Sequence, residues 1–192
     1  MLKFYYNDKE KLEQLNTSFI ATLGKYNQRD FDTEKVLLQL LDETCKIYHE
    51  RGYSNRENQA QTMKAELATA LRGIHPVTLE KVAVRRNEMQ MTIVFKLLST
   101  LGDMLRTDLE KIDTRLDEAR QLTAQIFVAA LQTNLLDTDK IKKIKTQQQI
   151  ENMWDTLSAD ANIALGQKRV LLLVSRFDVL LLCEELITQL KQ

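Results

Sequence analysis

The chain has 192 residues, and a chain of this length can bury well over half of the surface that it exposes when unfolded. Five glycines and one proline are too few for the many tight turns of an all-β fold. Basic and acidic residues total 27 each, so net charge gives no reason to expect nucleic acid or an acidic membrane as partner. We expect an all-α protein, an antiparallel helical bundle of six or seven helices with one or more long helices.

Apolar residues at helical spacing predict three helices in the first part of the chain. The first two cover about residues 8–24 and 32–52, because capping residues precede each and a glycine stands at each end. The third begins at Ser54, with Glu57 as its capping-box partner. It ends before Pro76, which disfavours helical geometry in the preceding residue.

Residues 77–101 fit either a hairpin with a turn at Arg86 and Asn87 or a helix. Helix is favoured because the apolar stripe continues in phase as far as Ala130, with spacings that alternate between four and three residues. Such a heptad seam is typical of a coiled coil. Gly102 leaves two alternatives open, namely one helix about 80 Å long at ~1.5 Å per residue or two antiparallel helices.

The remainder of the chain predicts a turn at 135–140 and a helix over 141–157, with Gly166 as a kink before the last segment. No internal repeat or linker interrupts the sequence. A single domain over 1–192 is therefore expected, with a subdivision near 74–78 as the alternative.

Residues 169–187 read RVLLLVSRFDVLLLCEELI and contain thirteen hydrophobic residues, enough length for a membrane span. Arg176 and Asp178 interrupt the run, and each costs roughly 2.5 to 3.5 kcal/mol at the centre of a span, against a gain of roughly 0.3 to 0.6 kcal/mol for each leucine or valine. We therefore expect no transmembrane helix.

This segment is predicted to form one helix over 169–190. A helical wheel then places Asp178 on a wet face and Arg176 opposite it, directed toward the interior and in need of an acidic partner. Two interpretations stay open. The helix is a central core element, or a face over Leu171, Val174 and Leu182 is covered by another copy of the chain or by a partner.

The sequence offers no catalytic, cofactor-binding or metal-binding constellation. Cys45 and His49 lie one helical turn apart, but two ligands do not make a metal site. His75 precedes a proline in a turn, and no phosphate-binding glycine loop or nucleophile elbow is present. We expect a protein that is not an enzyme and that needs no cofactor or metal.

Two cysteines, Cys45 and Cys183, lie far apart in the sequence, which is typical of free thiols in a reducing compartment. The N-terminal residues have no apolar stretch before their charges begin, so no signal peptide is expected. These features predict a cytoplasmic protein.

Basic residues are mildly concentrated in residues 46–96, which contain nine basic and five acidic groups. Arg85 and Arg86, with Lys81, form a basic cluster in this belt, and a second cluster lies at 140–145. Such clusters are more often solvated helix faces than phosphate sites, so nucleic acid is the less favoured partner.

The function that these features favour is a non-enzymatic module for protein–protein interaction, such as an adaptor, a chaperone-like protein or a regulatory subunit, which also self-associates. Two alternatives remain: nucleic-acid binding through the basic belt at 46–96, and ligand binding or catalysis in a pocket near Arg176. The residues expected to take part in interactions are Leu171, Val174, Leu182, Arg176, Arg85 and Arg86.

Overall fold

The structure of the protein is a computed structural model that describes residues 4–191. Within this range the chain forms eight helices and no strand, apart from one isolated bridge between Ile74 and Lys81. The expectation of an all-α protein is confirmed.

The chain divides into two compact units. The first is Lys9–Glu110, and the second combines Leu2–Asp8 with Lys111–Gln192, of which 4–8 and 111–191 are described. This division does not test whether the chain folds as a single domain, so the single domain stays a prediction. Each unit is described by itself.

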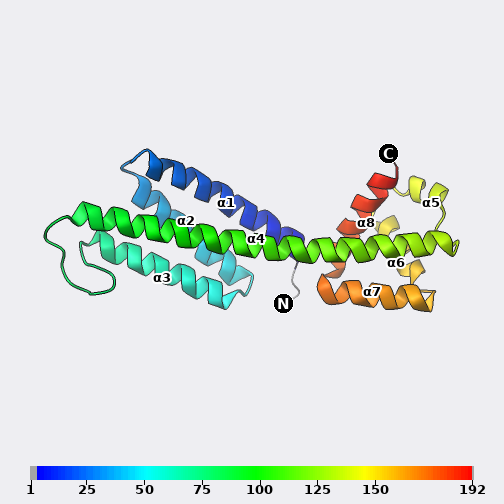
Figure 1. Cartoon of the computed structure of the whole chain (residues 1–192). Helices are drawn as coiled ribbons and strands as arrows, with labels where there is room; N and C mark the ends of the chain where they lie inside the picture. The colour runs from blue at the N-terminus through cyan, green and yellow to red at the C-terminus, as the bar shows by residue number, and fades with distance from the viewer. Residues whose placement is uncertain (1–3, 192) are drawn as a thin grey trace. The chain divides into compact units, whose positions relative to one another are not determined.

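The first unit is built from α1 (Tyr5–Asn27, from Lys9 onward), α2 (Thr33–Glu50), α3 (Ser54–Leu71) and α4 (Arg86–Gln132, as far as Glu110). Short connections reverse the chain twice, so α2 runs back along α1 and α3 runs back along α2 (Figure 1). Leucines on the inner faces of these helices form a buried core. The fully buried ones are Leu15, Leu37, Leu41, Leu67, Leu97, Leu98, Leu101 and Leu105.

The starts of α2 and α3 follow the prediction, whereas the end of α1 does not. Asp32 precedes α2, and Gly52 follows it with φ 69°, a left-handed conformation that glycine adopts without strain. The predicted stop at Gly24 is wrong: α1 continues to Asn27, and the Tyr26 ring packs on Phe95 of α4 with centroids 6.2 Å apart.

The predicted capping box of α3 is also wrong. Tyr53 occupies the N-cap position and makes no side-chain cap bond. The Glu57 carboxylate instead lies 3.1 Å from His49 Nδ1 and accepts a hydrogen bond from Gln61. Glu57 therefore connects α3 to the end of α2.

The helix α4 is continuous over 47 residues, about 70 Å at ~1.5 Å per residue. Of the alternatives, both the hairpin and the break at Gly102 are wrong. Helix is confirmed from Arg86 onward but not for 77–85, which is irregular. Gly102 does not end the helix. It lies against α1, since a Cβ at this position would stand 2.8 Å from Phe19 Cζ.

The second unit contains the remainder of α4 with α5 (Thr138–Lys143), α6 (Gln147–Leu157), α7 (Ala161–Leu173) and α8 (Arg176–Leu190). The helix α8 packs against α5, α6 and α7, which are labelled beside it in Figure 1. The core of this unit includes Ile126, Phe127, Ile141, Trp154, Leu157, Val170, Val179, Leu182 and Cys183.

Two predicted helices are each divided in the structure, so eight helices are present in the described residues instead of six or seven. The helix expected over 141–157 is split because the Thr146 side chain and Gln149 form a capping box that starts α6 afresh. The helix expected over 169–190 is split at Val174 and Ser175. Gly166 makes no kink and lies inside α7.

Candidate functional site

The segment singled out by its sequence, 169–187, forms a corner between α7 and α8. Ser175 is the N-cap of α8: its Oγ accepts a hydrogen bond from Asp178 N at 3.2 Å, while the Asp178 carboxylate accepts one from Ser175 N at 3.0 Å. This capping box ends α7 and restarts the helical phase. A single helical wheel anchored on Asp178 therefore misplaces the residues of α7 relative to those of α8, and it takes a buried capping acid for a residue of the wet face.

Asp178 is fully buried, which corrects the prediction that it lies on a wet face. Its carboxylate accepts hydrogen bonds from the backbone N–H groups of Tyr5 at 3.2 Å and Tyr6 at 3.0 Å, and from the Ser175 hydroxyl at 2.7 Å. These bonds satisfy N–H groups in the first turn of α1 as well as at the start of α8. Asp178 is therefore a structural residue of the second unit.

Arg176 is also not where the helical wheel placed it. As the first residue of α8 it is half-exposed, and its guanidinium donates to Glu151 Oε1 and to Asp155 Oδ2, each at 2.9 Å. The two carboxylates raise the pKa of Arg176, Asp155 first and Glu151 second. The acidic partners that the sequence required are thus on α6, and the cluster lies at the surface.

A hollow of about 270 Å³ lies beside this cluster and is lined by Gln147, Gln148, Glu151, Arg176, Phe177 and Leu180. Cys183, the thiol that a catalytic interpretation would add, is not part of this lining and is buried, and burial raises its pKa to about 12. The hollow is therefore lined by Arg176, whose charge is paired with Glu151 and Asp155, and the residues that line it include no thiol or hydroxyl nucleophile.

Of the three apolar residues expected on a contact face, the structure buries two. Val174 and Leu182 belong to the core, and Leu171 is partly exposed. The most exposed apolar residues of the segment are Leu172, with 82% of its surface accessible, and Phe177, with 62%. The sequence missed these two because their position depends on the break at Ser175.

The outer face of α7 carries further exposed residues. Leu165 and Leu172 are two turns apart and both exposed, and Lys168 and Arg169 lie between them on the same side of the helix. The chain contains no acidic residue from 161 to 177. We define the α7–α8 corner as five exposed residues close to the junction of the two helices, three apolar and two basic: Leu165, Lys168, Arg169, Leu172 and Phe177.

The other residues expected to interact, Arg85 and Arg86, lie at the start of α4, apart from this corner in sequence and in the other unit. Arg86 donates a hydrogen bond to the Leu71 carbonyl oxygen, so its guanidinium fixes the end of α3. Arg85 is exposed, 3.8 Å from Glu88. Several other cations of the belt at 46–96 are paired within the first unit: Arg56 with Asp108, Lys64 with Asp42, and Lys96 with Glu66.

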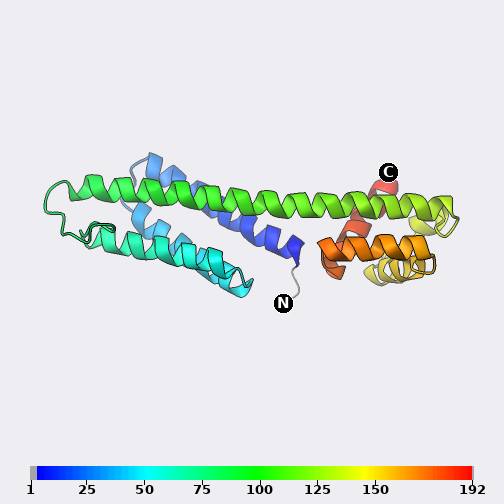
Figure 2. The same ribbon diagram turned by 60° about the horizontal axis from the view of Figure 1, so that its bottom comes forward.

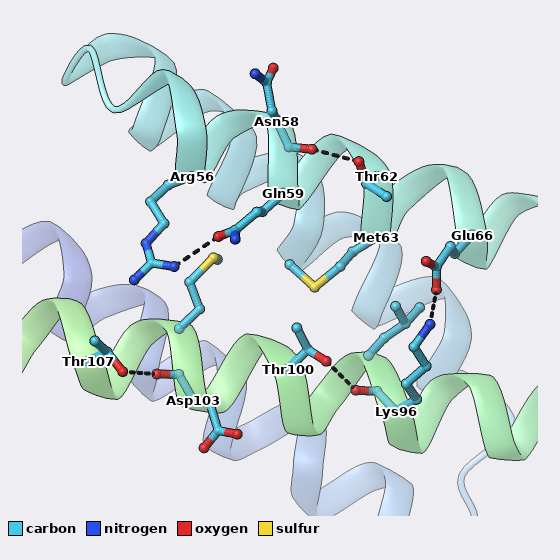
Figure 3. Close-up of a pocket in the computed structure, with 12 residues that line it drawn as sticks. Arg56, Asn58, Gln59, Thr62, Met63, Glu66, Lys96, Thr100, Asp103 and Thr107 are labelled. Carbon is cyan, nitrogen blue, oxygen red and sulfur yellow. Dashed lines mark hydrogen bonds and ion pairs between the residues drawn. The ribbon is translucent and has the colours of Figure 1, made fainter.

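A groove of about 600 Å³ between α3 and α4, shown in Figure 3, was not foreseen from the sequence. Its lining includes the apolar side chains of Met63, Leu97 and Met104, and the Glu66–Lys96 ion pair lies beside it. The threonine hydroxyls of its rim donate to carbonyl oxygens of their own helices. The three are Thr62, Thr100 and Thr107.

Two polar clusters hold tyrosine side chains within the units. In the first unit the Tyr48 hydroxyl donates to Asp108 Oδ2 at 2.9 Å, and Arg56 donates to the other oxygen of the same carboxylate. In the second unit the Tyr6 hydroxyl donates to Glu185 at 2.6 Å. Burial is the first cause that raises the pKa of both phenols above the usual value near 10, and the acidic partners add to it. Both phenols therefore keep their protons at neutral pH.

Cys45 and His49, which lie one helical turn apart, are not joined by further metal ligands among the described residues. Cys45 is half-buried and its pKa is raised, mainly by burial. His49 is exposed beside Glu57. In the described range, 4–191, no group of three or more histidine, cysteine or acidic side chains is placed to hold a metal ion.

None of the helices described between residues 4 and 191 has the combination of length and hydropathy that crossing a membrane requires. Comparison of the chain with protein-family models, with curated proteins and with solved structures found no match.

Proposed function

We propose that this protein is a non-enzymatic interaction module that binds a partner protein through the α7–α8 corner. It would act as an adaptor, a chaperone-like protein or a regulatory subunit. The observation that supports the proposal is the exposure of Leu172 and Phe177 in a segment that also supplies fully buried core residues such as Val170 and Val179.

The energetics favour covering this surface. Removing a leucine or phenylalanine side chain from water is worth about 1.5 to 3 kcal/mol. The rings of Phe4 and Phe177 already pack with centroids 5.9 Å apart, so Phe177 is held in place before a partner arrives. A preformed apolar anchor loses little conformational entropy on binding, which is typical of the residues that dominate interface energies.

The charge of the corner suggests the chemistry of the partner. Lys168 and Arg169 have no ion-pair partner among the residues that the structure describes. A partner helix with apolar residues two turns apart and carboxylates beside them would complement Leu165, Leu172 and the two cations. Self-association through this face is less favoured, because a two-fold contact would bring the basic residues of both copies together.

The two alternative functions have less support. Nucleic-acid binding by the belt at 46–96 would use cations of which several are already paired with acidic residues. Catalysis or ligand binding near Arg176 would use a small hollow whose cation is paired with Glu151 and Asp155.

The proposal is tested by affinity capture with the tagged chain followed by mass spectrometry. The double substitution Leu172→Ser with Phe177→Ser should remove at least one captured protein, and Lys168→Glu with Arg169→Glu should remove the same one. Ile20→Ser is the matched control, since Ile20 is exposed on α1 in the first unit. Light scattering of the purified chain measures self-association in parallel. If the captured proteins are the same for the corner variants and the control, the α7–α8 corner is not the binding surface.

A further inference from the structure

The connection between α3 and α4, residues 72–85, is long but ordered. Val82 N donates to the Gly73 carbonyl oxygen at 2.8 Å, and His75 N donates to the Glu80 carbonyl oxygen at 2.9 Å. Leu79 N donates to the His75 carbonyl oxygen at 2.9 Å. These bonds close the segment into a hairpin-like loop, so its tip has a defined conformation.

This loop exposes apolar side chains. Val77, Leu79 and Val84 are 74%, 73% and 76% accessible, although none of them is needed to make a turn. Leu79 also has φ 59°, a left-handed conformation that is unfavourable for a bulky residue. The backbone of Leu79 is held by its hydrogen bond to His75, but its side chain stays largely in water and gains little burial within the loop. This points to a role outside the chain.

Basic residues flank the apolar tip. From 72 to 86 the chain carries Arg72, Lys81, Arg85 and Arg86 against the single acid Glu80, four positive charges less one negative, which is +3. All four basic residues are exposed. Neither Arg72 nor Lys81 has an ion-pair partner among residues 4–191. The charges of Arg72 and Lys81 are therefore available to an anionic surface, whereas Arg85 Nε lies 3.8 Å from Glu88 Oε2 and Arg86 donates to the Leu71 carbonyl oxygen.

The loop projects beyond the ends of α3 and α4 in the first unit (Figures 1 and 2). The connection between α1 and α2 lies at the same end of this unit, because the helices alternate in direction, and its Phe31 is fully exposed. A projecting tip with apolar side chains and flanking cations has the chemistry of a segment that enters the headgroup region of a bilayer.

We propose that the 72–85 connection binds to the surface of an anionic lipid membrane. Val77, Leu79 and Val84 enter the interfacial region, while Lys81, Arg85 and Arg72 meet the lipid phosphates. A nucleic acid would use the same cations but would leave the three apolar side chains in water, so lipid accounts for both features. The surface is separate from the α7–α8 corner and does not depend on the function proposed for that corner.

The test is flotation of the full chain with vesicles of phosphatidylcholine alone and of phosphatidylcholine mixed with phosphatidylglycerol. We expect binding to the mixed vesicles that weakens as salt is raised, and little binding to phosphatidylcholine alone. Val77→Ser with Leu79→Ser should reduce the bound fraction about tenfold, and Lys81→Glu with Arg85→Glu should abolish binding.

Matched controls for both kinds of variant come from the second unit. Leu165→Ser with Leu172→Ser removes two exposed leucines, and Lys140→Glu with Lys142→Glu reverses two exposed lysines of the cluster at 140–145. Both should bind vesicles like the unmodified chain, and far-UV circular dichroism shows whether each variant keeps its helix content. The leucine control also separates this proposal from the proposed function, since it should alter protein capture but not vesicle binding.

Three results would overturn the proposal. The first is no binding to the mixed vesicles at low salt. The second is equal loss of binding in a control pair and in the corresponding loop pair. The third is loss of binding on charge reversal while the serine variants bind normally. The chain would then be attracted to the vesicles by charge alone, without insertion of the apolar side chains. If the serine variants change the set of captured proteins instead, the loop is a protein-binding surface and not a lipid-binding one.

Discussion

At the scale of single residues, the Asp178 carboxylate accepts four hydrogen bonds within the second unit. One carboxylate joins the first turn of α1 to the start of α8 through Tyr5 N, Tyr6 N and Ser175. Each of these groups donates to an oxygen of Asp178. The position is therefore suited to a carboxylate, because both of its oxygens accept hydrogen bonds.

Asp178→Asn is therefore expected to destabilise the second unit by about 2 kcal/mol, because the new amide NH₂ would face donors and leave a buried N–H without an acceptor. Urea unfolding followed by fluorescence measures this locally, since Trp154 is the chain's one tryptophan and is buried in the second unit. Asp139→Asn, in the first turn of α5, is the exposed control and should leave the midpoint unchanged. Equal midpoints for Asp178→Asn and the unmodified chain would contradict the structural role.

The two cysteines should differ strongly in reactivity. Burial raises the pKa of Cys183 to about 12, so only about one molecule in ten thousand carries its thiolate at pH 8. Cys45 is half-buried and its pKa is raised as well. We expect iodoacetamide to modify Cys45 first in the folded chain and Cys183 only after unfolding in urea, as peptide mapping by mass spectrometry would show. Similar rates at both positions under native conditions would mean that the second unit opens readily.

At the scale of helices, α4 passes Gly102 without a break, although glycine costs a helix interior about 1 kcal/mol relative to alanine. Glycine is suited to this position because the Phe19 ring of α1 lies there, with Cζ 2.8 Å from where a Cβ would stand. The close approach of α1 to α4 accounts for a residue that helix propensity alone disfavours.

A double-mutant cycle separates propensity from packing at this contact. Gly102→Ala is expected to destabilise the chain by about 1 kcal/mol, because overpacking outweighs the gain in propensity. In a Phe19→Leu background the same substitution should stabilise it by up to about 1 kcal/mol, since the ring is gone. Thermal unfolding followed by far-UV circular dichroism measures all four proteins. The same sign in both backgrounds would show that the Phe19 contact does not determine the effect.

Helix interiors could be predicted from the sequence better than helix ends. Apolar periodicity identified α2, α3 and most of α4, because buried leucines repeat there at helical spacing over many turns. The break at Ser175 was missed, since its signal is a single serine followed three residues later by an acid inside an apolar run. Because this signal was missed, Asp178 was predicted to lie on the wet face. That prediction placed Arg176 on the inner side of the helix and Leu182 on a contact face.

At the scale of the whole molecule, the balance of 27 basic and 27 acidic residues had little predictive value for function. The mild excess in residues 46–96 becomes informative only with the structure, which pairs Arg56, Lys64 and Lys96 with acids but leaves Arg72 and Lys81 at an exposed loop. The groove between α3 and α4 could not be predicted either. It depends on how far apart two helices pack, and helical periodicity does not specify that distance.

The same charge balance predicts how copies of the chain interact in solution. The composition of the sequence gives an isoelectric point of about 6.8, so repulsion between copies is expected to be weakest near neutral pH and to grow on either side. Static light scattering should therefore give a second virial coefficient that is lowest near pH 6.8. Lys140→Glu with Lys142→Glu lowers the net charge by four and should move this minimum to lower pH. Leu172→Ser changes no charge, so it should leave the pH of the minimum where it is. A minimum that stays in place when the two lysines are reversed would mean that local surfaces, and not net charge, govern these interactions.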